Sequence, residues 1–293
     1  MDPTKDENCD VHYLASDLPQ PLPTLKEIEE AGSTYKTYLN LHQVARIGEN
    51  YITKKGQALA FEGWTMLYLR KMTSIALPTV YAILTDKKAE RDIIVMEYIP
   101  GPSLDNWADL EASQKEDIAK QLAAHFSELR ALPSLGVFGR ALPPEYGNLK
   151  KDVLPDFMFR TVAGDEFGGP FDTVQQVGQA LADVMRANSA AHAERAKLWE
   201  SLIPEILKEG PPVFTHGDLQ RKNIILRDDG KVFIIDWGLS GWFPECWEYC
   251  YTMYAAGEFE SDWHAYIPKF LSKFPSEFCL TLVLRNVHHG SHM

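Results

Sequence analysis

The sequence predicts an α+β protein with two lobes, a small lobe rich in strands and a larger, mainly helical one. Short apolar segments separated by polar turns fill residues 40–56 and 78–99, and a helix-forming stretch at 57–72 lies between them. Pro100-Gly101-Pro102 then breaks the chain, and long helix-forming stretches follow. A length of 293 residues accommodates two such lobes.

The expected elements follow one another along the chain. Residues 1–34 are expected to form an arm that ends in a short acidic helix. The small lobe spans 35–99, where Gly48-Glu49-Asn50 predicts a hairpin turn before the helix and the last two strands. The helical lobe spans 100–287, with helices within 105–131, 172–208 and 244–284, a Gly/Pro-rich segment at 133–171 and short strands within 211–240. Residues 288–293 are interpreted as a tail left by protein expression.

The composition limits the kinds of partner. The chain has 41 Asp and Glu against 29 Lys and Arg, a net charge of −12, which excludes the basic surface of a general nucleic-acid binder. No segment approaches the roughly 18 apolar residues that cross a bilayer, and the polar N-terminus lacks a secretory signal. Four cysteines are too few for a disulfide framework. We therefore expect a monomeric, cytoplasmic protein that acts on a small molecule, with no membrane or nucleic-acid partner.

One stretch carries most of the functional information. It begins with His216-Gly217-Asp218, reaches Asn223 five residues after the aspartate, and continues as strand, turn and strand to Asp236. Because Asp229-Gly230 is a strong signal for a two-residue type I′ hairpin turn, the two strands are expected to place Asn223 directly opposite Asp236. The hairpin would then hold an amide and a carboxylate side by side.

These residue types suit phosphoryl transfer. The oxygens of Asn223 and Asp236 suit a hard cation such as Mg²⁺. Asp218 is placed to accept a hydroxyl proton without being a metal ligand, and Arg221 and Lys222 add positive charge near the transferred group. Taken singly, such residues are more often turn residues or helix caps, so it is the joint pattern that predicts a function.

The pattern His216-Gly-Asp218-Leu-x-x-x-Asn223, followed by Ile-Ile-Asp236-Trp, resembles the aminoglycoside phosphotransferase/choline kinase family of kinase-like small-molecule phosphotransferases. The resemblance extends over roughly residues 40–285 and implies a bilobal protein-kinase-like fold. It also implies that Asp218 is the catalytic base and that Asn223 and Asp236 bind Mg²⁺. The segment from Trp242 to Tyr249, Trp-Phe-Pro-Glu-Cys-Trp-Glu-Tyr, resembles one that is common in fungal members.

In the N-terminal half, the resemblance implies a strand lysine for the ATP phosphates and a helix glutamate that holds this lysine. Lys54 ends a predicted strand, and Glu62 lies in the predicted helix on a face otherwise apolar. We prefer Lys54 for this role, with the adjacent Lys55 as the alternative. The other interpretation is a solvated Lys54-Lys55 turn with Glu62 reaching solvent.

The segment before the Pro-Gly-Pro break resembles the last small-lobe strand and the hinge of a kinase. The resemblance implies that the backbones of Glu97 and Ile99 pair with the nucleotide base, while the same residues equally satisfy a plain buried strand. Two departures are visible: residues 35–56 lack a Gly-rich loop, and Gln220 stands where protein kinases carry a lysine. The second departure favours the small-molecule branch.

We therefore expect an ATP- and Mg²⁺-dependent kinase that phosphorylates a hydroxyl of a small molecule, for example a cationic amine or an aminoglycoside-like compound. The alternative is an inactive pseudokinase that binds nucleotide or serves as a scaffold, and the choice between ATP and GTP stays open. The aromatic residues of 242–254 are interpreted as core, with a cage for an ammonium group beside Glu245 and Glu248 as the alternative. Acidic residues of the helical lobe that could face a cationic acceptor are Asp105, Asp165, Glu166, Asp172, Glu245 and Glu248.

Overall fold

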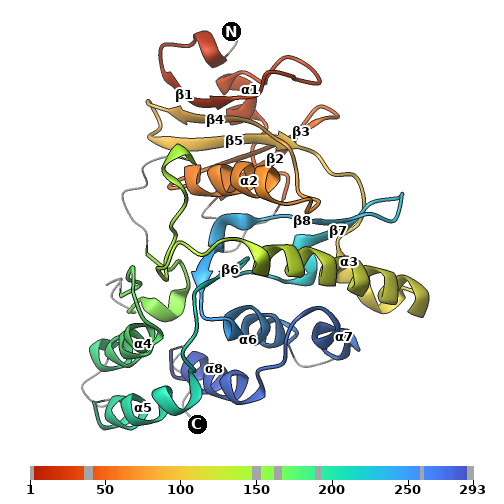
Figure 1. Ribbon diagram of the computed structural model, residues 1–293. Helices are drawn as coiled ribbons and strands as arrows, with labels where there is room; N and C mark the ends of the chain where they lie inside the picture. The colour runs from red at the N-terminus through yellow and green to blue at the C-terminus, as the bar shows by residue number, and fades with distance from the viewer. Residues whose placement is uncertain are drawn as a thin grey trace. The chain divides into compact units, whose positions relative to one another are not determined.

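The computed structural model describes residues 3–35, 42–146, 153–161, 167–188, 193–257 and 261–288. The chain divides into two compact units, shown in Figure 1. The N-terminal unit consists of residues 1–101 and 225–238, and the C-terminal unit of residues 102–224 and 239–293. The N-terminal unit therefore includes both the arm and a hairpin from the second half of the chain. Within the described residues, no helix combines the length and the apolar character needed to span a membrane.

An antiparallel sheet of five strands forms the centre of the N-terminal unit, in the order β1-β4-β5-β3-β2. The expected Gly48 turn joins β2 to β3, where Gly48 has a positive φ of 64°. The arm contributes β1, which pairs with β4. The strands are β1 (Cys9–Leu14), β2 (His42–Ile47), β3 (Tyr51–Gly56), β4 (Val80–Asp86) and β5 (Arg91–Glu97).

Each face of this sheet is covered by a different part of the chain. Helix α2 (Ala60–Met72) lies along one face (Figure 1), where Gly63 allows close approach because a Cβ there would lie 2.8 Å from Ile83 Cδ1. The opposite face packs against the arm and α1 (Leu25–Glu30) through a cluster that includes Leu22 and Ile28. Since side chains alternate along a strand, neighbouring residues of β3 face these two different environments.

The hairpin of β7 (Ile224–Leu226) and β8 (Val232–Ile234) has a different turn from the predicted type I′ turn. Only Gly230 has a positive φ, 80°, whereas a type I′ turn requires positive φ at both central residues. The Gly230 N–H donates to the Arg227 carbonyl, and the Arg227 N–H donates to the Lys231 carbonyl. This is a three-residue loop ending in a left-handed glycine. It pairs Arg227 with Lys231, one residue away from the predicted register, so the hairpin register does not set Asn223 opposite Asp236.

The C-terminal unit is mainly helical, with a pair of short strands, β6 (Val213–Thr215) and β9 (Gly241–Phe243). The predicted helical region 172–208 forms two helices that pack side by side, and the region 244–284 forms three (Figure 1). The helices are α3 (Ala112–Ala131), α4 (Val174–Asn188), α5 (Ala193–Ile206), α6 (Cys246–Ala255), α7 (Trp263–Phe270) and α8 (Pro275–His288). Short 3₁₀ helices are η1 (Pro3–Lys5), η3 (Leu104–Asp109), η4 (Pro144–Tyr146), η5 (Phe157–Phe159), η7 (Arg221–Asn223) and η8 (Trp237–Leu239).

Candidate active site

A buried lysine holds two carboxylates together in the N-terminal unit. Lys54 Nζ lies 2.7 Å from Glu62 Oε2 and 2.6 Å from Asp236 Oδ1. Lys54 is 6% exposed and Glu62 is 2% exposed. Burial alone would lower the pKa of Lys54, but the charges of Glu62 and Asp236 outweigh this effect and raise its pKa above the ordinary value. Lys54 therefore remains a cation fixed between two anions.

Strand register and helix placement create this cluster. Lys54 lies opposite Ile94 of β5, on the face that α2 covers, and Glu62 lies in the first turn of α2. Asp236 follows β8 in a left-handed conformation with φ of 65°, unusual for a residue other than glycine. Gly238 lets the chain pass close to the helix, because a Cβ there would lie 3.1 Å from Glu62 Oε2.

Lys55 faces the other side of the sheet, as the alternation of a strand requires. Its ammonium group bonds to Glu29 of α1 and lies 3.6 Å from Asp86 Oδ2. The structure therefore places Lys54, and not Lys55, beside Glu62 and Asp236. Pairing His42 with Gly56 and Val44 with Lys54 also brings His42 to the Lys54 face, where burial and the charge of Lys54 lower the pKa of His42.

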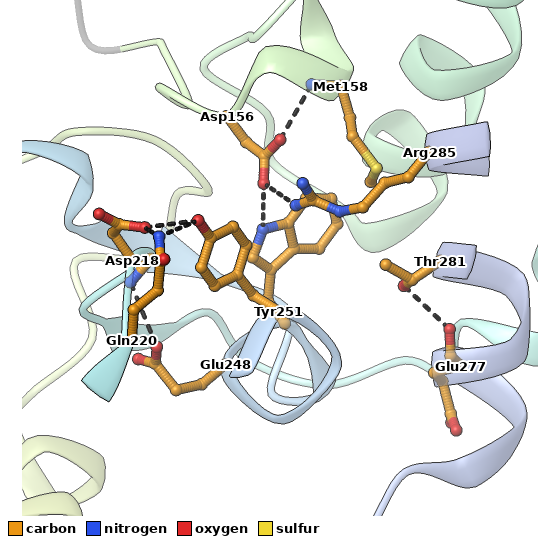
Figure 2. Close-up of polar contacts among 11 residues, drawn as sticks. Asp156, Met158, Asp218, Gln220, Glu248, Tyr251, Glu277, Thr281 and Arg285 are labelled. Carbon is orange, nitrogen blue, oxygen red and sulfur yellow. Dashed lines mark hydrogen bonds and ion pairs between the residues drawn. The ribbon is translucent and has the colours of Figure 1, made fainter. Parts of the chain in front are cut away.

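The loop between β6 and β7 carries Asp218, whose two carboxylate oxygens both accept hydrogen bonds. Asn223 Nδ2 donates to Asp218 Oδ2 at 2.9 Å and also to the Asp218 carbonyl at 2.9 Å. Gln220 Nε2 and Tyr251 Oη both donate to Asp218 Oδ1 (Figure 2). All three donors are neutral, so the carboxylate is held in place while its charge is not cancelled by a cation among these contacts.

A buried glutamate supports the same loop from α6. Glu248 is fully buried and accepts hydrogen bonds from the backbone N–H groups of His216 and Gly217, the second at 3.3 Å. His216 Nδ1 accepts from the Asp218 N–H at 3.2 Å. Glycine is required at 217, since its φ is 80° and a Cβ would lie 2.2 Å from the Leu239 carbonyl. Burial raises the pKa of Glu248, although His216, Arg130 and the two N–H groups oppose this effect.

The other predicted nucleotide contacts have different surroundings in the structure. Arg221 Nη1 donates to Ser261 Oγ at 3.2 Å, and Lys222 is exposed. The Glu97 carboxylate accepts from the backbone N–H and hydroxyl of Thr79, and the Glu97 N–H donates to the Thr79 carbonyl. The side chain and the N–H of Glu97 therefore both have partners within the N-terminal unit, and Ile99 is buried.

The acidic residues expected near an acceptor differ in their surroundings. Asp105, Asp172 and Glu245 are exposed. Asp165 and Glu166 lie outside the described residues. Glu248 has no exposed surface with which to meet a substrate, because both of its oxygens face the backbone of the loop. The prediction that Glu248 contacts a substrate is therefore wrong. Glu248 instead supports the backbone of the loop.

Sequence reasoning missed Tyr251 as a neighbour of Asp218. A signal was present, because residues three apart on a helix share a face, and Glu248 and Tyr251 have this spacing on α6. That face is the one directed at the loop, as the hydrogen bonds of both side chains show.

The fold described above is that of a kinase-like phosphotransferase. The sequence model of the phosphotransferase enzyme family matches residues 54–266, which is more than half of the chain. The chain therefore belongs to this family and is a small-molecule kinase, as predicted. No curated protein sequence matches it.

Solved structures of aminoglycoside phosphotransferases share the fold. The GDP and kanamycin complex of APH(2")-IIia is 14% identical, with a TM-score of 0.58 over 87% of this chain and 83% of that chain. ADP-bound APH(2'')-Ib is 15% identical, with a TM-score of 0.56 over 88% and 86%. The streptomycin–ATP complex of APH(2")-IIa is 14% identical, with a TM-score of 0.53 over 88% and 85%. These similarities confirm the predicted α+β, protein-kinase-like fold.

Proposed function

We propose that this kinase transfers the γ-phosphoryl group of ATP to a hydroxyl of a cationic small molecule, with Asp218 as the catalytic base. The observation that carries the proposal is the environment of Asp218. Its oxygens are fixed by three neutral donors, Asn223, Gln220 and Tyr251. A carboxylate that is held but not neutralised can receive the proton of an acceptor hydroxyl during phosphoryl transfer.

Lys54 would bind the phosphates of the nucleotide, and Glu62 would keep it oriented. Lys54 is suited to this role because its neighbours hold it charged, and Glu62 is too deeply buried to exchange its partner for water. The carbonyl of Glu97 and the backbone of Ile99 would pair with the base. Arg221 and Lys222 would add positive charge near the phosphates, which for Arg221 requires a change from its contact with Ser261.

The donor set at two positions fits Mg²⁺. Asn223 commits its amide N–H₂ to Asp218, so its oxygen is the atom that a cation would use. Asp236 offers a carboxylate that is 41% exposed. Both are hard oxygen donors, and Mg²⁺ commonly takes one or two such protein ligands together with substrate phosphates and water. When bound, the ion would neutralise charge on the phosphate oxygens during transfer.

The acceptor is proposed to be cationic, of the aminoglycoside or simple amine class. The net charge of −12 attracts a cation at long range, and Asp105, Asp172 and Glu245 are exposed on the C-terminal unit. Two of the structural neighbours are described in complex with kanamycin or streptomycin. We further propose that the protein acts as a monomer in the cytoplasm, and sedimentation velocity tests the first of these two points.

A phosphorylation panel read by mass spectrometry tests the function. The purified protein is incubated with Mg·ATP or Mg·GTP and with kanamycin, streptomycin, gentamicin, hygromycin B, choline or homoserine. We expect a singly phosphorylated product from at least one cationic acceptor, and no product from Asp218→Ala. Thermal stabilisation by Mg·ATP without any phosphorylation would instead support a pseudokinase, and an active Asp218→Ala variant would remove Asp218 from the mechanism.

A further inference from the structure

A buried arginine of α8 lies among aromatic rings and a carboxylate in the C-terminal unit (Figure 2). Arg285 is 1% exposed. The centre of its guanidinium group lies 4.4 Å from the ring centroid of Phe157 and 4.8 Å from those of Tyr251 and Tyr254. Arg285 Nη2 lies 2.9 Å from Asp156 Oδ2. These aromatic rings therefore surround a cation, and that cation is the side chain of Arg285.

Asp156 anchors this arginine. Asp156 is 5% exposed, and its Oδ1 accepts from the Met158 N–H at 2.9 Å. Its Oδ2 accepts from Trp247 Nε1 at 3.0 Å as well as from Arg285. A charge pair buried to this degree is costly to break, because either charge alone would lack both water and a partner. Arg285 is consequently fixed in position.

Tyr251 connects the buried pair to the candidate base. One face of its ring contacts Arg285, and its hydroxyl donates to Asp218 Oδ1 while accepting from Gln220 Nε2 at 3.0 Å. Burial, together with the charge of Asp218, raises the pKa of Tyr251 well above its ordinary value. The hydroxyl thus stays protonated and remains a donor.

We infer that Asp156, Arg285 and Tyr251 form a positioning chain that holds the carboxylate of Asp218 in its reactive orientation. The inference rests on the proposed role of Asp218 as base. Each member fixes the next: Asp156 fixes the guanidinium group, the guanidinium group fixes the tyrosine ring, and the tyrosine hydroxyl fixes Asp218 Oδ1. Helix α8, near the end of the chain, therefore contributes to turnover without supplying a group that touches substrate.

The positioning chain of Asp156, Arg285 and Tyr251 also restricts where an acceptor can be held. Phe157, Tyr251 and Tyr254 are occupied by Arg285, so these rings do not serve as an ammonium cage for a substrate in this structure. A cationic acceptor must be recognised by other groups.

A double-mutant cycle with Tyr251→Phe and Arg285→Met tests the inference. Turnover is measured with the most active acceptor of the panel above, or as hydrolysis of Mg·ATP alone if the panel yields none. Because Tyr251→Phe removes one oxygen atom and keeps the ring, we expect kcat to fall roughly tenfold, the effect of losing one hydrogen bond to a charged group. The KM for ATP should change less than about twofold, since the positioning chain acts on the catalytic base Asp218.

If Tyr251 and Arg285 act through one positioning chain, the double variant should be no slower than the slower single variant. Arg285→Lys, which retains a cation, should recover part of the activity lost in Arg285→Met. Tyr249→Phe is the matched control, because it removes a hydroxyl from the same helix at a residue that packs against Phe274 and Phe278. It should leave kcat unchanged.

Two results would overturn the positioning chain. One is wild-type kcat in a folded Tyr251→Phe variant when Asp218→Ala is inactive. The other is a pair of single effects that multiply in the double variant, because this would show that Tyr251 and Arg285 act independently. An active Asp218→Ala variant would contradict the proposed base itself, which is a separate failure.

Discussion

The two units of the molecule hold Lys54 and Asp218, the groups proposed to act in the reaction, in opposite ways. In the N-terminal unit, the Lys54 cation is balanced by the carboxylates of Glu62 and Asp236. In the C-terminal unit, the carboxylates of Asp218 and Glu248 are held mainly by neutral N–H and O–H donors. Ion pairing keeps a lysine charged and stationary, which suits phosphate binding. Neutral donors fix a carboxylate while preserving its charge, which suits proton acceptance.

The strongest test of this contrast is the Asp218→Asn substitution. Asparagine keeps the size of the side chain but cannot accept the hydroxyl proton, so we expect kcat to fall about 10³-fold. The measurement is the steady-state turnover of the best acceptor. Asp229→Asn, at an exposed turn, is the control and should retain full activity. Near-normal turnover of Asp218→Asn would show that its charge is not needed.

The ion-paired cluster is tested by comparing Lys54→Met with Lys55→Met. Removing Lys54 leaves the buried Glu62 carboxylate without its cation, which is expected to reduce the free energy of unfolding by about 3–5 kcal/mol. The same change should abolish the thermal stabilisation produced by Mg·ATP. Lys55 lies on the other face of the sheet, so Lys55→Met should keep nucleotide binding. Loss of binding in Lys55→Met alone would reverse the assignment. Both variants are followed by urea denaturation and by thermal shift.

Glu248→Gln tests how a buried carboxylate behaves when its donors are neutral backbone groups. Burial raises the pKa of Glu248 in the folded protein. The folded state then binds a proton more tightly than the unfolded state, so this group's contribution to stability falls as pH rises above the ordinary glutamate pKa. The variant lacks this titration. Its stability relative to the wild type should therefore increase as pH rises above the ordinary glutamate pKa, as measured by urea denaturation. A difference that is constant with pH would contradict the raised pKa.

The smallest effect is expected at the exposed pair of Arg227 and Asp229 in the hairpin turn. The guanidinium group of Arg227 and the Lys231 N–H lower the pKa of Asp229 to about 2. Its contribution to stability is present above the ordinary aspartate pKa and is lost as pH falls toward about 2. Compared with Asp229→Asn, the wild type should lose slightly more thermal stability on acidification. Identical acid profiles would show that this exposed pair contributes nothing.

In the β7–β8 hairpin, the local sequence predicted the position of the turn but not the register of the two strands. Asp229-Gly230 correctly predicted a turn at this point of the chain. The register differs by one residue because the turn takes Gly230 alone into the left-handed region, and Asp229 instead accepts the Lys231 N–H with its side chain. Both loops are compatible with the same residues, and a pattern read along one strand does not distinguish them.

Which of Lys54 and Lys55 lies beside Glu62 is decided by the helices that cover the two faces of the sheet. The sequence places both lysines at the end of one strand, and alternation alone says only that they face opposite sides. Which side carries Glu62 is decided by α2, which covers the face of Ile83 and Ile94. The other face is taken by α1, whose Glu29 pairs with Lys55.

The sequence by itself determined the α+β class and the kinase-like family, because these depend on residue type and on spacing along the chain. Tertiary structure alone decided that Glu248 supports the loop rather than facing a substrate, and that Arg285 occupies the aromatic cage. Asp156, Asp218, Tyr251 and Arg285 come from separate segments. Their contacts depend on how helices pack, which no local pattern encodes.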